Sequence, residues 1–355
     1  MDKKSRLNEA FQLVKPDRPP ILGGWLAAPA HICTLTGCTE DEYWQNPMVW
    51  AVEAERVLDS DGLVTTVKPA RRGDFRIIDA QTLENRSRYT LETVLKEIAS
   101  LPTPEEQRAQ FNENQEYASI KIDYLSMQER CGEMLWCEAD WDVIPRALWY
   151  DQYGYENALT LPLVDPEAHL KLMRHKAENA RQRAILQARL IQEGHRPPAI
   201  LTGEDLCSQR GPMINPQYLR KDYFTLLEYA IEPLLNVGAK LVWHCDGDVR
   251  PILQDVLACG FAGLQGFQDE CGMELDWIVD LKTRHGDPLL IFGPISVTRT
   301  LPFSTPQEVR QSVQKAMDLC KNKASLVFFT SNTINPDVPL ENLLAYWDEV
   351  KQSCW

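Results

Sequence analysis

Apolar and polar positions alternate regularly along the second half of the chain. From about residue 195, short runs rich in β-branched and aromatic residues are separated by longer stretches in which apolar residues recur with a helical period. The predicted strands are AILTGEDL (199–206), KLVWHCDGD (240–248), GLQGFQ (263–268), PLLIFGPI (288–295) and SLVFFTSN (325–332). The predicted helices cover 218–237, 249–258, 275–284, 306–321 and 340–350. Because each helix returns the chain to the edge where the previous strand began, the strands should be parallel.

The first half carries a weaker version of the same pattern. Strands are expected at PPILGGWLA (19–27), DGLVTTVKP (61–69) and EMLWCEAD (133–140), with a helix over 40–59. Three strands and five make the eight of a closed barrel, so we predict an α/β fold of the (β/α)8 TIM-barrel class. No linker divides the chain, so residues 1–355 should form one domain, with a helical insertion over about 84–130.

Two helices have recognisable local signals. Thr305-Pro306-Gln307-Glu308 combines a capping hydroxyl, a first-turn proline and a glutamate that can close a capping box, so it predicts a helix start. The predicted helix over 167–192 has an apolar stripe, and its many lysines and arginines lie elsewhere. Such a charge run is typical of a solvated face, with a binding patch as the alternative.

Charge and composition narrow the possible partners. The chain has 51 acidic and 37 basic residues, a formal charge of −14, which repels nucleic acid and anionic lipid. The start, MDKKSRLNEAFQLV, lacks the apolar core of a signal peptide, and no apolar run could span a bilayer, so we expect a cytoplasmic protein without membrane contact. The ten cysteines show no CxxC spacing, which indicates small buried side chains rather than a zinc ribbon or a disulfide framework.

The most reactive stretch of the sequence is LVWHCDGDVRPIL (241–253), at the end of a predicted strand. In a barrel the carboxyl ends of all strands form one mouth, where catalytic residues gather. Side chains alternate along a strand, so His244 and Asp246 should point into the barrel and Cys245 toward the helices. Asp248 is predicted to cap the helix that follows.

His244 and Asp246 fit two functional roles. The imidazole could transfer a proton while Asp246 fixes its tautomer, or both could bind a divalent metal such as zinc. A histidine that is simply satisfied within the core is the alternative. Two ligands are too few for tight zinc binding, so a third would come from another polar residue at the mouth: Glu204, Asp205, Glu270 or Cys271.

Further residues at the strand ends complete the predicted site. We expect catalytic roles for His244, Asp246 and Glu204. The residues expected to bind substrate are Asp205, Gln268, Glu270, Asn332 and Trp141. An exposed carboxylate pair at 204–205 and a turn at Asn332 are the alternatives. Trp141 belongs to an aromatic-rich segment over 136–155, which would form either a pocket wall or a lid packed on the barrel.

The order of several motifs resembles the uroporphyrinogen decarboxylase superfamily, which also contains corrinoid-linked methyltransferases. These motifs are DRPPILGGW, EDEYWQNP, GEDLCSQRGPMINPQYL, HCDGDVRPIL, GFQDECGMELDWIVDLK, GPISVTRTLPFSTPQEV and NPDVPLENL. The resemblance covers most of the chain. It implies a (β/α)8 barrel with a ligand funnel at the carboxyl ends of the strands, and it is compatible with a homodimer.

The chain departs from both known branches of the superfamily. Uroporphyrinogen decarboxylases have an arginine-rich signature after the first strand, but here residues 23–37 read GGWLAAPAHICTLTG, so a substrate with many carboxylates is disfavoured. The methyltransferases hold zinc with an H-x-C pair and a distant cysteine. In this chain Asp246 replaces the cysteine of the pair and Asn332 the distant one, so only His244 matches and any metal would have harder oxygen ligands.

Methyl transfer is the activity that the resemblance favours. A small methoxylated or methylated substrate would give its methyl group to a corrinoid carried by a separate protein. His244 with Asp246 or Glu204 would protonate an oxygen leaving group, or a metal would polarise it. The alternatives are decarboxylation of a small acid or tetrapyrrole precursor, and binding of a tetrapyrrole-type ligand without catalysis.

Overall fold

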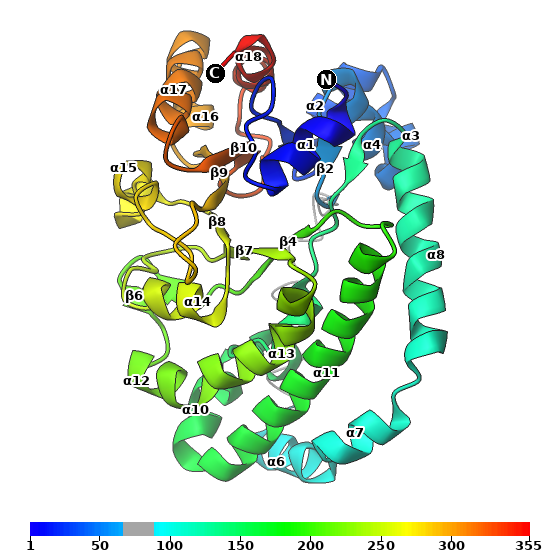
Figure 1. Ribbon diagram of the computed structural model, residues 1–355, viewed down its shortest axis with the longest axis vertical. Coiled ribbons are helices and arrows are strands. Elements are labelled where there is room, and N and C mark those ends of the chain that lie inside the picture. Colours follow the sequence, from blue (N-terminus) through cyan, green and yellow to red (C-terminus); the bar gives the residue numbers. More distant parts are fainter. Residues whose placement is uncertain (67–88) are drawn as a thin grey trace.

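Two parallel sheets form the centre of the protein in a computed structural model, which describes residues 1–66 and 89–355 (Figure 1). The first sheet has the order β1 (Leu22–Gly23), β2 (Gly62–Leu63) and β3 (Leu135–Trp136). The second has the order β10 (Ser325–Thr330), β9 (Leu290–Ile295), β8 (Gly263–Gln265), β7 (Lys240–His244) and β4 (Ala199–Gly203). Neighbouring strands in both sheets are parallel, as predicted. A small antiparallel pair, β5 (Cys207–Ser208) and β6 (Gly211–Pro212), follows β4.

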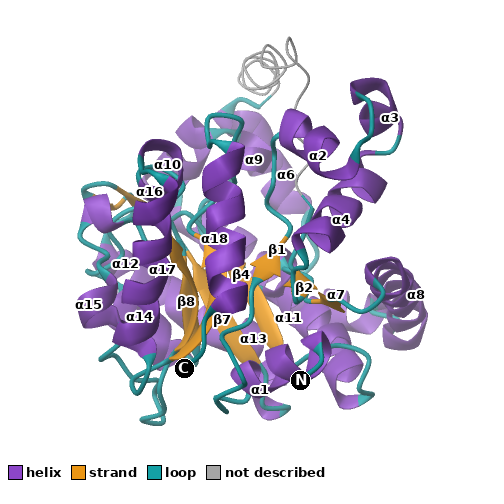
Figure 2. Cartoon of the chain, turned by 90° about the horizontal axis from the view of Figure 1, so that it is seen from above, coloured by secondary structure: helices purple, strands orange, loops and turns teal. Residues whose placement is uncertain are grey.

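Helices surround these strands (Figure 2). Those of the first half are α1 (Lys3–Phe11), α2 (Pro29–Thr36), α3 (Glu40–Gln45), α4 (Pro47–Leu58), α6 (Leu91–Ser100), α7 (Pro104–Gln110), α8 (Glu113–Cys131), α9 (Tyr150–Tyr153), α10 (Tyr155–Val164) and α11 (Pro166–Gln192). Those of the second half are α12 (Pro216–Tyr218), α13 (Phe224–Asn236), α14 (Leu253–Cys259), α15 (Leu275–Ile278), α16 (Thr300–Phe303), α17 (Pro306–Cys320) and α18 (Leu340–Gln352). Short helical turns lie at Trp141–Val143, Leu219–Tyr223 and Asp269–Cys271. Within the described ranges, none of these helices pairs the length with the apolar character that crossing a bilayer requires.

Three helices lie in the range of the predicted insertion. α6, α7 and α8 pack along the long helix α11 and extend away from the sheets, with α6 and α7 at the far end (Figure 1). Thr103 and Glu106 form a capping box at the start of α7. The part of the predicted insertion at 84–88, and residues 67–69 of the second predicted strand, lie outside the described residues.

Several predicted boundaries were wrong for local reasons. The expected helix over 40–59 is divided at Asn46-Pro47, because proline lacks a backbone N–H and disfavours helical geometry in the residue before it. The expected cap at Asp248 is also wrong, since α14 begins only at Leu253 and Pro251 disfavours helix at the residue before it. The Asp248 carboxylate instead accepts hydrogen bonds from the backbone N–H and the guanidinium of Arg250. By contrast, the capping box predicted before α17 is present.

The inner faces of both sheets and helix α1 share one apolar cluster. Its buried members are Leu7, Ala10, Phe11, Leu22, Trp25, Val64, Leu135, Cys137, Ala139, Ala199, Leu201, Val242, Leu290, Phe292, Val327 and Phe329. Along β7, Val242 belongs to this cluster, whereas Leu241 and Trp243 pack outward against the helices. The period of two along a strand therefore places His244 on the inner face.

A buried ion network fixes the N-terminal segment to the first sheet. The Asp61 carboxylate is fully buried and accepts hydrogen bonds from Arg6 Nη1 (2.5 Å), Arg18 Nη1 (2.8 Å) and the Ile21 N–H (2.9 Å). A buried charge is tolerated only with such partners, so loss of Asp61 would leave Arg18 without this partner and Arg6 with Asp17 alone as its acidic partner among the described residues.

We expect Asp61→Asn to lower the free energy of unfolding by about 3–5 kcal/mol, because Arg6 and Arg18 would lose their shared buried anion. Denaturant unfolding followed by circular dichroism measures this change. The control is Glu92→Gln, which removes an exposed ion pair with Lys96 and should change the free energy of unfolding by less than about 0.5 kcal/mol. An equally small effect of Asp61→Asn would contradict the role of Asp61 as a stabilising buried anion.

Candidate functional site

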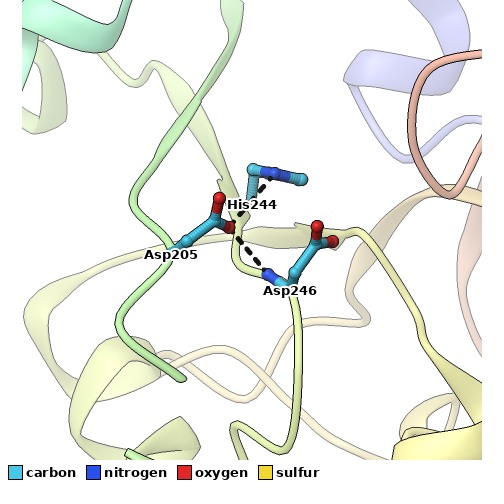
Figure 3. A group of neighbouring side chains, drawn as sticks. All are labelled: Asp205, His244 and Asp246. Atoms are coloured by element: carbon cyan, nitrogen blue, oxygen red, sulfur yellow. Dashed lines mark hydrogen bonds and ion pairs between the residues drawn. The ribbon is translucent and has the colours of Figure 1, made fainter. Parts of the chain in front are cut away.

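Three side chains meet just beyond the carboxyl ends of the neighbouring strands β4 and β7 (Figure 3). Asp205 follows β4, while His244 ends β7 and Asp246 lies two residues beyond it. His244 Nε2 lies 3.6 Å from Asp205 Oδ1, and the same oxygen accepts the backbone N–H of Asp246 at 3.0 Å. One nitrogen of His244 and one oxygen of each carboxylate all lie within 4.8 Å of one another. They are close enough to bind one cation together.

Among the described residues, only one oxygen of the Asp246 carboxylate has a hydrogen-bond partner. Asn332 Nδ2 donates to Asp246 Oδ2 at 2.7 Å, and Asn332 Oδ1 accepts the N–H of Thr333, which fixes the direction of the amide. Asp246 Oδ1 is buried and has no hydrogen-bond partner among the described residues. Burial raises the pKa of Asp246 above its ordinary value of 3.8; the charge of His244 opposes this rise and that of Asp205 adds to it. The free oxygen is therefore suited to a cationic ligand.

A glutamine holds the other side of His244. Gln265 Nε2 donates to the backbone carbonyls of Thr330 (2.8 Å) and Ser331 (3.1 Å), and Gln265 Oε1 contacts His244 Nδ1. The sequence interpretation missed Gln265 because it considered only the last residues of GLQGFQ. Alternation along the strand puts Gln265 on the same face as Gly263, but only the register of the folded sheet pairs it with His244.

Two indole rings enclose the imidazole. His244 packs edge-on against Trp25 and Trp141, with ring centroids 5.7 Å apart in each case, and the two indoles stack at 6.4 Å. Trp141 was among the predicted residues, whereas Trp25, at the end of GGW, was not. Only 8% of His244 is exposed. The rings therefore form an apolar wall beside an imidazole whose Nε2 faces the carboxylates.

A buried polar network positions Trp141. The preceding residue, Asp140, accepts hydrogen bonds from Arg183 Nε (2.6 Å) and Gln187 Nε2 (2.5 Å) on α11. Its backbone N–H donates to Leu201 O of β4 at 2.9 Å. The segment that carries Trp141 is thus attached both to a helix and to the second sheet.

Two other predicted residues border the cluster. Gln268 Oε1 accepts the N–H of Gly247 at 2.7 Å, so it holds the turn after Asp246. Glu270 Oε1 accepts a hydrogen bond from Thr298 Oγ1 at 2.7 Å, and its buried Oε2 has no hydrogen-bond partner within the described part of the chain. The charge of Glu270 adds to the rise in the Asp246 pKa, which places a further negative charge near the cluster.

Glu204 has a different environment from the cluster. Its carboxylate is buried and accepts the backbone N–H groups of Ala147 (2.7 Å) and Leu148. Burial raises the pKa of Glu204 to about 8, although the two backbone donors favour the charged form. In the structure Glu204 therefore connects the end of β4 to the segment after Trp141, and its catalytic role stays a prediction. Of the four candidates for a third ligand, Asp205 is the one that lies beside His244. Cys245 is buried in the cluster that packs against the helices, as expected.

The fold is similar to that of a solved enzyme. A methyltransferase from Methanosarcina mazei matches the structure with a TM-score of 0.60 and 16% sequence identity, over 99% of this chain and 99% of that chain. At this identity the likeness shows a shared fold. Among curated proteins, none matches the sequence.

A family profile identifies the sequence itself. The profile described as Uroporphyrinogen decarboxylase (URO-D) matches residues 153–353, which include β4, β7, β8, β9 and β10 and the cluster at their ends. This match spans more than half of the sequence and agrees with the order of motifs found along it. The chain therefore belongs to the uroporphyrinogen decarboxylase (URO-D) family.

Proposed function

We propose that this protein is a methyltransferase that moves a methyl group from a small methylated or methoxylated substrate to a corrinoid carried by a separate protein. The observation that carries the proposal is the cluster of Asp205, His244 and Asp246 at the strand ends of a URO-D family chain. The full-length likeness to a methyltransferase supports the reaction class. The corrinoid partner follows from the resemblance of the motifs to corrinoid-linked relatives.

We further infer that the two sheets close into one eight-stranded barrel. Ile21, just before β1, pairs in parallel with Phe328 of β10. At the opposite edges, the N–H of Asp140 donates to Leu201 O. The shared inner cluster, to which α1 contributes, supports the same arrangement. In such a barrel the site lies at the funnel formed by the carboxyl ends of the strands.

The cluster fits a divalent cation with nitrogen and oxygen ligands. Asp246 Oδ1 is buried without a hydrogen-bond partner among the described residues, and a bound cation would offset that cost. Asp205, His244 and Asp246 would hold the ion, a donor set suited to a harder metal than a thiolate site would select. When bound, the ion would supply a positive charge that polarises the leaving group of the methyl donor.

The residues around the cluster have separate roles in this proposal. Trp25 and Trp141 would bind the apolar part of the substrate and keep water from His244. Asn332 would hold Asp246 in place. His244 would be the nitrogen ligand of the ion, through Nε2.

Charge around the mouth favours a neutral or cationic substrate over an acid. A carboxylate would meet Asp205, Asp246 and Glu270. Two arginines of the neighbouring loops already pair with acids, Arg250 with Asp248 at 2.8 Å and Arg299 with Asp269 at 3.8 Å. Decarboxylation of a small acid therefore has weaker support than methyl transfer.

We expect His244→Ala and Asp246→Asn each to lower methyl-transfer turnover by about a hundredfold or more, because each removes a proposed ligand of the ion that would polarise the leaving group. Methylation of chemically reduced free cobalamin, followed by absorbance with methanol, methylamine or methoxybenzene as donor, measures turnover. Asp248→Asn is the matched control, since this acid pairs with Arg250, and its turnover should stay within twofold (about 0.4 kcal/mol) of the unaltered protein. Carbon dioxide release from a small acid without cobalamin would instead support a decarboxylase.

Glu204 predicts a pH dependence of stability. Its pKa is higher in the folded than in the unfolded chain, so the folded state binds the proton more tightly. The stability gained in this way is fully present below about pH 4.5 and is lost as the pH rises through about 8. Between pH 5 and 9, the unaltered protein should lose at least about 1.4 kcal/mol of unfolding free energy relative to Glu204→Gln, which does not titrate. If the free energies of unfolding of the two proteins change equally between pH 5 and 9, the raised pKa of Glu204 is ruled out.

A further inference from the structure

We propose that Gln265 is a positioning residue that holds the His244 imidazole in one tautomer, with the proton on Nδ1 and the lone pair of Nε2 directed at the carboxylates. The inference concerns the same site as the proposed function and deepens it. It does not depend on which molecule donates the methyl group.

The direction of the Gln265 amide follows from its neighbours. One end of the side chain lies between two backbone carbonyl oxygens, those of Thr330 (2.8 Å) and Ser331 (3.1 Å). Carbonyl oxygens only accept hydrogen bonds, so this end must be the NH₂ group, and a flipped amide would place three oxygens together. Gln265 is 3% exposed, which leaves little water to compensate a flipped amide. Oε1 therefore faces His244.

The tautomer follows from the direction of the amide. A neutral imidazole has one N–H donor and one acceptor nitrogen. Because Oε1 can only accept, the Nδ1 atom of His244 that contacts it must carry the proton. Nε2 is then unprotonated, and its lone pair lies 3.6 Å from Asp205 Oδ1. Two acceptors at that distance attract each other only if a proton or a cation lies between them, which is the arrangement a metal ligand needs.

The side chains around His244 disfavour other orientations of its ring. Trp25 and Trp141 pack against it edge-on, so the ring cannot swing away without moving them. Gly266 leaves room for the ring, because a Cβ at this position would lie only 2.9 Å from His244 Nδ1. Its φ of +93° also favours glycine. If the ring rotated by half a turn, a carbon atom would face Oε1 and the hydrogen bond would be lost.

The same turn also holds Asp246. The carbonyls that orient Gln265 belong to Thr330 and Ser331, and the next residue, Asn332, donates to Asp246 Oδ2. The end of β10 therefore orients two members of the cluster through two different side chains. A metal-binding histidine is commonly fixed through its second nitrogen in this way, and loss of such a partner weakens metal binding by about tenfold to hundredfold.

The first experiment is a measurement of the tautomer. Protein containing ¹⁵N-labelled histidine is examined by NMR at about pH 8, above the ordinary histidine pKa of about 6.5, with the His244 signals assigned from their loss in His244→Asn. We expect Nδ1 protonated and Nε2 unprotonated in the unaltered protein, and a shift toward protonated Nε2 in Gln265→Leu. Protonated Nε2 in the unaltered protein, or no shift in Gln265→Leu, would overturn the inference.

Gln128 provides a matched control. It also bridges backbone groups, donating to Gly132 O (3.3 Å) and Met134 O (3.0 Å) and accepting the Trp136 N–H (2.9 Å), but none of its partners in the described part of the chain is an imidazole. Gln128→Leu should leave the His244 tautomer unchanged. If Gln265→Leu does not fold, Gln265→Met, which keeps the length of the side chain without the amide, takes its place.

The second experiment measures Co²⁺ affinity by titration, followed by visible absorbance. Gln265→Leu should bind Co²⁺ about tenfold to hundredfold more weakly than the unaltered protein, and Gln128→Leu within about twofold of it. Equal affinity of Gln265→Leu and the unaltered protein would overturn the positioning role. If the unaltered protein has the expected tautomer but binds no Co²⁺, the metal in the proposed function is wrong and the inference about Gln265 stands.

Discussion

The register of β7 between β4 and β8 determines where the His244 imidazole lies in the site. His244 pairs with Gly203 on one side and with Gln265 on the other. A shift by one residue would turn His244 toward the helices and Cys245 toward the inner face, because side chains alternate along a strand. Gly203 permits the close approach, since a Cβ there would lie 2.0 Å from His244 O. The backbone pairing alone thus determines on which face of the sheet the imidazole lies.

Side-chain interactions then orient what the register brings together. Gln265 and Asn332 connect His244 and Asp246 to the last residues of β10, while Asp205 is left with both an imidazole nitrogen and a backbone N–H near one oxygen. The cluster gathers negative charge in a partly buried place, which is unfavourable unless a proton or cation compensates it. This unbalanced charge is the physical reason to expect a cationic ligand at this point of the fold.

The sequence was informative at several positions where a local rule was sufficient. Alternation along KLVWHCDGD correctly placed Cys245 on the side that packs against the helices. Asn332, expected at the same strand ends, lies beside Asp246, and its role in substrate binding stays a prediction. It was less informative where a contact joins distant segments. The attachment of Glu204 to Ala147 and Leu148 depends on the fold of a segment more than fifty residues away, and no spacing in the sequence reveals it. Gln265 was missed because its importance comes from the register and not from its own segment.

The most direct test of the central claim is the coordination of a metal by the purified protein. Elemental analysis combined with X-ray absorption at the metal edge, after loading with Zn²⁺ and removal of the excess, identifies the ligand atoms. We predict about one ion per chain, coordinated only by nitrogen and oxygen atoms, and loss of that ion in Asp246→Asn. Sulfur ligands from any of the ten cysteines, or a protein that binds no ion, would contradict it.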